Sequence, residues 1–254
     1  MRGMWSRRWS RKALLLAGAL AALAAPAAAQ RAAHPDFTGT WERYPVASGE
    51  PADPRYAPTP IPDPPLKPQY LQKYRDNQAK LASRLKEGQP AGDNYVHCLP
   101  DGMPAMMMGM FPMEIFQRPE QINITQEAFT QLRRIYMNEK LPSAQDIDPS
   151  FYGRSVGHWE GDTLVVETTG IKPSVEFRWT PHSENMKITE RIRLLAPDYL
   201  QDKITVEDEY LEKPWTYSYT FKRMKGYKMQ EYVCEDNREY VDADGKQKLK
   251  LPGE

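Results

Sequence analysis

Cysteine and histidine are scarce in this sequence, with two cysteines and four histidines among 254 residues. No C-x-x-C or H-x-x-x-H spacing accompanies them, so the usual signature of a zinc site is absent. A glycine-rich phosphate loop and a nucleophile elbow are also lacking. These absences argue against a zinc protein, a nucleotide-binding α/β protein and a serine hydrolase, and no metal or cofactor is expected.

Long apolar runs are lacking apart from one near the start. Ala13 to Ala25 is too short to span a bilayer, and no integral membrane span is expected. The run follows basic residues at positions 7, 8, 11 and 12 and ends in small residues. This predicts a signal peptide over residues 1–29, removed before Gln30 by the Sec or the twin-arginine route. The sequence therefore predicts a periplasmic or secreted protein.

Basic charge is not clustered in the rest of the chain. The predicted signal peptide holds five basic residues and no acids, which leaves 29 Lys and Arg against 34 Asp and Glu. The resulting net charge of −5 argues against nucleic acid or an anionic membrane as a partner. In an oxidising compartment, Cys98 and Cys234 are expected to form a disulfide; two buried free thiols are the alternative.

Two kinds of segment precede the main domain. Prolines recur between Tyr44 and Pro68, which favours an extended arm, because proline denies backbone donors to a helix or a central strand. Good helix formers over Tyr70 to Lys86 then predict one amphipathic helix. We assign residues 30–95 to an N-terminal strand, arm and helix, and residues 96–254 to the main domain.

Alternation with a period of two dominates the main domain. Short segments rich in β-branched and aromatic residues are separated by turn formers. The expected strands cover residues 36–42, 113–117, 121–126, 129–137, 155–159, 162–169, 187–195, 202–208, 216–223 and 228–234. We predict an all-β fold: an antiparallel up-and-down, lipocalin-like barrel of about eight to nine strands. The early strand with Gly39 and Trp41 is expected to be part of this barrel. A β-sandwich is the alternative.

Several motifs resemble a family of exported, largely uncharacterised bacterial proteins. The resemblance covers nearly the whole chain after residue 30 and implies export and a β-barrel-like fold, without a settled reaction. The chain departs from the family at His158, where Arg is usual, and at residues 138–140, where an Asp-Gly-Arg turn is usual. The motifs are Asp36-Phe37-Thr38-Gly39-Thr40-Trp41, Cys98-Leu99-Pro100-Asp101-Gly102-Met103-Pro104, Gly157-His158-Trp159-Glu160-Gly161-Asp162-Thr163-Leu164-Val165-Val166, His182-Ser183 with Glu190-Arg191, Lys213-Pro214-Trp215, and Glu231-Tyr232 with Cys234-Glu235.

Three carboxylates share strand faces with apolar residues. Alternation turns Glu190, Asp208 and Glu231 inward, where desolvation would raise the pKa of a carboxyl group and suit it to acid/base chemistry. The alternative is that each is neutralised and only fixes the register. His182 is the first choice for proton transfer, because it occupies a loop before the Glu190 strand; a surface loop histidine is the alternative.

Six of the chain's 12 methionines lie between His97 and Met113. Three uses are open: an adaptable apolar plug, a lip that contacts a ligand, or a Cu(I) site. The ligand-binding candidates are Trp159, Arg191, Met103, Met107, Met110 and Tyr219, although alternation turns Arg191 outward.

We expect an exported barrel that binds a small apolar or aromatic molecule in a cavity with a few acidic groups. The alternatives are a cofactor-independent lyase, isomerase or hydratase, a periplasmic copper-binding protein, and a structural protein with a solidly packed interior. The sequence does not choose an oligomeric state.

Overall fold

The computed structural model describes residues 34–45, 51–89, 98–234, 239–244 and 246–249. All of them belong to one compact unit, His34–Glu254. The expected signal peptide and His97 lie outside the described residues.

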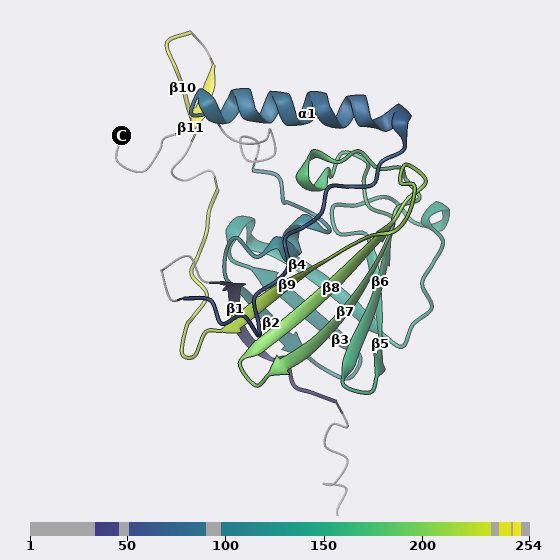
Figure 1. Cartoon of the computed structure of the whole chain (residues 1–254). Helices are drawn as coiled ribbons and strands as arrows, with labels where there is room; N and C mark the ends of the chain where they lie inside the picture. Colours follow the sequence, from purple (N-terminus) through teal and green to yellow (C-terminus); the bar gives the residue numbers. More distant parts are fainter. Residues whose placement is uncertain (1–33, 46–50, 90–97, 235–238, 245, 250–254) are drawn as a thin grey trace, which may run out of the picture. The chain divides into compact units, whose positions relative to one another are not determined.

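Nine strands form a closed barrel in which sequence neighbours are also neighbours in space, and β9 closes on β1 (Figure 1). The predicted β-barrel is therefore confirmed. The strands are β1 (Gly39–Tyr44), β2 (Met113–Gln117), β3 (Gln121–Gln126), β4 (Gln131–Met137), β5 (Arg154–Glu160), β6 (Thr163–Thr169), β7 (Lys187–Ala196), β8 (Tyr199–Glu207) and β9 (Trp215–Arg223).

One strand pair departs from the predicted antiparallel order. β4 and β5 run parallel, with Ile135 opposite Ser155, and every other pair in the barrel is antiparallel. A closed ring must contain an even number of direction reversals, so nine strands require at least one parallel pair. A parallel pair needs a crossover connection, and the segment 138–153, with the short helix η3 (Ala144–Asp146), supplies it.

The barrel core follows the alternation of the strands. Trp41 is fully buried, donates from Nε1 to the Phe37 carbonyl over 2.9 Å, and has the Arg223 guanidinium 4.1 Å above its ring. Most of the methionine-rich segment is also core, around the short helix η1 (Ala105–Met108). The buried methionines there are Met103, Met106, Met107 and Met113. Their burial supports the plug among the three uses considered above.

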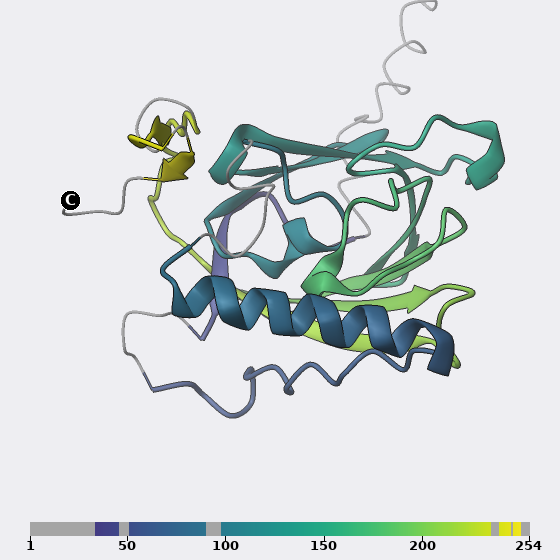
Figure 2. The same ribbon diagram turned by 90° about the horizontal axis from the view of Figure 1, so that it is seen from above.

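The proline-rich segment, residues 51–66, is an extended arm held along β8 and β9. Tyr56 stacks on Tyr199, and Trp215 Nε1 donates to the Pro62 carbonyl over 2.9 Å. The helix α1 (Pro68–Lys86) follows, two residues longer than expected at its start. It lies next to the short helix η4 (Phe177–Trp179), as the contacts and Figure 2 show, but none of its residues is buried. Tyr70, Leu71 and Tyr74 on α1 are partly buried and pack against the core, and Tyr70 stacks on Tyr210.

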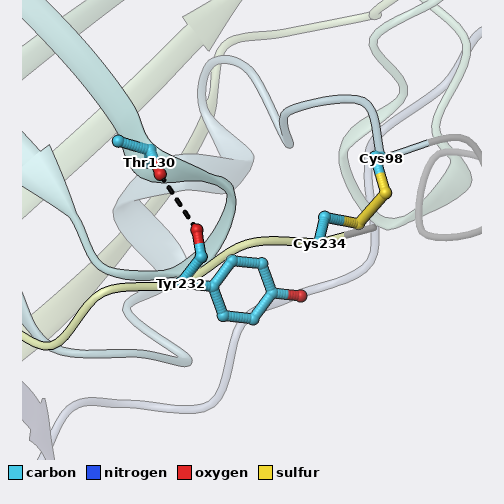
Figure 3. The surroundings of a disulfide bond; sticks show 4 residues. All are labelled: Cys98, Thr130, Tyr232 and Cys234. Carbon is cyan, nitrogen blue, oxygen red and sulfur yellow. Dashed lines mark hydrogen bonds between the residues drawn. A yellow bond between two sulfur atoms is a disulfide. The ribbon is translucent and has the colours of Figure 1, made fainter. Parts of the chain in front are cut away.

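Cys98 and Cys234 are bonded, with 5.6 Å between their Cα atoms, which confirms the predicted pair (Figure 3). The strand expected over residues 228–234 is wrong: this tail has no strand pairing. It crosses the β3–β4 connection instead, where Thr130 Oγ1 donates to the Tyr232 carbonyl over 3.1 Å. Further along, β10 (Glu239–Val241) and β11 (Gln247–Leu249) form a separate two-stranded sheet.

Candidate functional site

A row of polar side chains runs around the inside of the barrel. Six consecutive strands contribute to it, each through a residue on its inward face. The row consists of Arg133 on β4, Ser155 on β5, Thr168 on β6, Glu190 on β7, Asp202 on β8, and Tyr217 and Tyr219 on β9, and all seven are buried. Burying so many polar groups is costly unless they pair, so their contacts decide what the row can do.

Arg133 and Glu190 form a buried ion pair. Both side chains are fully excluded from solvent. Arg133 Nη1 donates to Glu190 Oε1 over 2.8 Å, and Nη2 donates to Glu190 Oε2. The guanidinium also donates to the hydroxyls of Ser155 (3.2 Å) and Thr168 (3.0 Å). Glu190 therefore lies inside the barrel as predicted, but its charge is fully engaged by Arg133.

Asp202 is the second carboxyl group of this row, and it finds no such partner. It is fully buried, and neither oxygen has a hydrogen-bond donor among the described residues. Burial, reinforced by the nearby charge of Glu190, raises the Asp202 pKa well above its ordinary value, although the charge of Arg133 opposes the shift. A protonated Asp202 can donate a hydrogen bond to Glu190.

A groove of about 260 Å³ opens beside this row, between the arm and the barrel wall. β1 pairs with β9 only as far as Tyr44 opposite Thr220, so the preceding part of β9 has no β1 partner. The arm passes that part of β9 and forms the other wall. The groove is lined by Arg43, Pro58, Thr59, Pro60, Ile61, Arg178, Ser218 and Tyr219.

The two arginines of the groove have no acidic partner among the described residues. Arg43 lies over the Tyr219 ring, 5.1 Å from its centroid. The Tyr219 hydroxyl is buried and makes no hydrogen bond to a described residue. Burial raises the Tyr219 pKa, and the charges of Arg43 and Arg178 counteract part of that rise. Two cations and the ring of Tyr219 therefore line one small groove.

An unusual turn places Arg178 in the groove. Arg178 and Trp179 both have positive φ values, 51° and 57°, a conformation that costs free energy for residues other than glycine. Helix α1 supports this turn: Gln78 Nε2 donates to the Arg178 carbonyl over 2.9 Å, and Asn77 Nδ2 to the Trp179 carbonyl over 3.0 Å. These two hydrogen bonds from α1 therefore help to hold a groove residue in position.

His182 and Asp208 line a second, much smaller cavity of about 20 Å³, room for about one water molecule. His182 is buried, and its ring nitrogens lie 2.7 Å and 2.9 Å from the carbonyl oxygens of Ser183 and Val175. Asp208 follows β8 and accepts from the Ser183 amide and hydroxyl. Both ring nitrogens are engaged, so this geometry favours a role in loop structure over proton transfer.

The other candidate residues do not share one site. Glu231 is exposed on the unpaired tail, so the expected inward direction is wrong. Arg191 is exposed and paired with Glu160 over 2.8 Å, and Trp159 stacks on His34 with ring centroids 4.7 Å apart. Met103 and Met107 are core residues, and Met110 is 61% exposed. Among the ligand-binding candidates, Tyr219 lines the groove.

Arg133, Asp202, Arg43 and Arg178 were not among the predicted site residues. Strand alternation could have identified three of them, because each shares a strand face with an apolar residue. These pairs are Arg133 with Ile135, Asp202 with Ile204, and Arg43 with Trp41. No periodicity marks Arg178, because it lies in an irregular connection.

Neither a scan of protein-family models nor a search of curated proteins gives a match to this chain. Within the described residues, no group of three His, Cys, Asp or Glu side chains is arranged to hold a metal ion. None of the described helices has the length and apolar character needed to cross a membrane.

Proposed function

We propose that the protein binds a small organic acid, with the acid group on Arg43 and Arg178 and an apolar or aromatic body against the arm. The observation that carries this proposal is that two arginines without acidic partners among the described residues line one groove, together with Tyr219. Guanidinium groups match carboxylates in shape and charge. Pro58, Pro60 and Ile61 supply apolar surface on the opposite wall.

The size of the groove limits the ligand class. Drug-sized ligands occupy sites of about 300–1,000 Å³, and this groove has about 260 Å³. A single-ring acid therefore suits it better than a lipid or a polycyclic compound. The proposal keeps the binding barrel expected from the sequence, but it assigns recognition of the polar group to arginines instead of acids.

Two other functions have less support. The groove contains no carboxylate or imidazole, and His182, Asp208 and Glu231 lie elsewhere, so an acid/base enzyme lacks a proton acceptor beside the proposed ligand. A copper site is not favoured either, because Met103 and Met107 pack in the core while Met110 faces solvent. An exported location is part of the proposal: the Cys98–Cys234 bond fits an oxidising compartment.

Calorimetric titration with benzoate and with benzamide tests this function. The two compounds have nearly the same shape, and benzoate alone carries a charge. We expect benzoate to bind and Arg43→Gln or Arg178→Asn to weaken it by about 10- to 100-fold each, because a hydrogen bond to a charged group contributes about 1.5–3 kcal/mol. Asparagine is used at position 178 because it tolerates the positive φ there.

Arg191→Gln is the matched control, since it removes an exposed arginine that lies outside the groove. This variant should bind benzoate as the wild type does, and benzamide should bind no better to the wild type than to the Arg43/Arg178 double variant. Equal benzoate affinity in the wild type and the double variant would contradict the proposal, as would no benzoate binding at all.

The support that α1 gives to the groove can be tested in the same way. An Asn77→Ala/Gln78→Ala variant loses both hydrogen bonds to the turn that carries Arg178. We expect benzoate affinity to fall about fivefold, equivalent to about 1 kcal/mol, measured by calorimetry. Gln72→Ala is the control, because among the described residues that amide donates to Asp76 on the helix itself. If both variants bind benzoate equally, α1 does not position Arg178.

A further inference from the structure

The interior carboxyl pair lies directly behind the groove. Asp202 is opposite Tyr219 in the β8–β9 register, and Tyr219 also lines the groove. Glu190 lies diagonally from Asp202 on the inner face, since its own partner on β8 is Ile204. One side chain therefore separates the proposed ligand from the pair.

Charge balance inside the barrel requires a proton. The groups that face Asp202 are Glu190 from β7, Tyr217 and Tyr219 from β9, and Arg133 from β4. Arg133 is the one cation among them, and both of its terminal nitrogens are taken by Glu190. Two ionised carboxylates would therefore leave one buried negative charge without a donor, which is costly.

A proton can neutralise the buried Asp202 carboxylate, whereas water and ligand atoms cannot reach it. Neither Asp202 oxygen is in contact with solvent, so a water molecule or a ligand atom has no access to them in this structure. A proton taken from solvent forms an O–H bond on Asp202, and that group donates to Glu190. The interior then carries the charge of Arg133 and one compensating negative charge.

Resting on the function proposed above, we infer that the groove binds its organic anion together with one proton held by Asp202 and Glu190. A ligand anion bound beside Tyr219 adds a negative charge one side chain away from Asp202, on the strand that pairs with β8. That charge makes the ionised form of Asp202 more costly. Anion binding and proton binding therefore strengthen each other, and this coupling is reciprocal. The expected ligand is therefore a weak acid. Its anion binds in the groove while the interior carboxyl pair binds a proton, and the anion is released as the pH rises.

The test is benzoate titration between pH 6 and pH 9, where benzoate itself stays ionised. For the wild type, affinity should fall by up to about tenfold per pH unit once the carboxyl pair loses its proton. Titration in phosphate and in Tris, which differ in ionisation enthalpy, should reveal net proton uptake on binding. Asp202→Asn should abolish both effects while retaining binding, because the amide donates to Glu190 without a proton to lose.

Asp162→Asn is the matched control, since Asp162 is exposed on the β5–β6 turn; it should behave as the wild type does. Wild-type binding without proton uptake, or with the same pH dependence as Asp202→Asn, would overturn this inference and leave the binding function standing. Failure of benzoate to bind at any pH would refute the binding function itself. Proton uptake is measured on the wild type, so the test does not depend on how well the variant folds.

The same carboxyl group has a defined effect on stability. Its pKa is raised on folding, so the stability it contributes is complete below the unfolded pKa and is lost as pH rises through the folded pKa. The free energy of unfolding of the wild type should therefore fall with rising pH relative to that of Asp202→Asn.

Discussion

Replacing Arg133 with methionine is expected to lower the free energy of unfolding by about 3–5 kcal/mol. Arg133 is fully buried and supplies the positive charge for Glu190. Without it, the Glu190 charge has no counter-ion inside the barrel, and the Ser155 and Thr168 hydroxyls lose a shared donor. Urea unfolding followed by tryptophan fluorescence measures the change.

Arg134→Met is a matched control on the same strand. Arg134 is exposed, and its replacement should change the unfolding free energy by no more than about 0.5 kcal/mol. The double variant Arg133→Met/Glu190→Gln should regain part of the loss, because it removes both members of the pair. Equal stability of the Arg133→Met and Arg134→Met variants would show that the buried pair contributes little.

Glu190→Gln is expected to be milder than Arg133→Met. From the sequence alone, this change removes a buried charge at constant size and leaves the fold intact. The structure adds that Arg133 then loses its partner, which would be costly, but also that Asp202 lies close enough to interact with it. An ionised Asp202 can replace Glu190 as the counter-charge, so the arginine does not remain uncompensated.

The strand pattern predicted the barrel because each strand has one face in the core. Ile122 and Ile124 alternate with more exposed residues in β3, and Glu190 points inward between Ile188 and Ile192 as expected. The β4–β5 direction was not predictable from periodicity, since alternation is the same in parallel and antiparallel strands. The need for a parallel pair follows from the odd number of strands, and the sequence left eight and nine strands both open.

The tail over residues 228–234 shows where alternation misleads. Met229, Glu231 and Val233 alternate with polar residues or tyrosine as a strand would, yet Glu231 and Val233 are exposed. A strand also needs a partner edge, and β1 already pairs with β9 and closes the barrel. Local sequence does not encode which edges are occupied, so the error arose from the topology.

The groove was harder to predict than the interior row. Arg133 and Asp202 lie on strands, and the strand alternation that identified Glu190 as inward-facing would have identified them too. Arg178 is brought near Arg43 by an irregular turn more than 130 residues later in the chain. Tertiary contacts from α1 and the arm create that proximity, and single-sequence periodicity contains no information on them.

The disulfide joins the start of the methionine-rich segment to the tail that follows β9. Cys98 precedes the methionine-rich plug, and Cys234 ends the tail that follows β9, at a sequence separation of 136. Other contacts of the tail include hydrogen bonds from Tyr227 and Gln230 to Glu127, the bond from Thr130 to the Tyr232 carbonyl, and the contact of Tyr232 with Phe129. Most of these contacts are partly exposed, so each contributes modestly.

A Cys98→Ser/Cys234→Ser variant is therefore expected to lose about 4–5 kcal/mol of unfolding free energy, because closing so long a loop removes much chain entropy from the unfolded state. Urea unfolding of the oxidised wild type, the reduced wild type and the variant measures this loss, and the last two should agree. Mass mapping of non-reduced peptides should recover Cys98 linked to Cys234. Equal unfolding midpoints for oxidised and reduced protein would contradict the prediction, since the barrel would then be stable without its longest covalent loop.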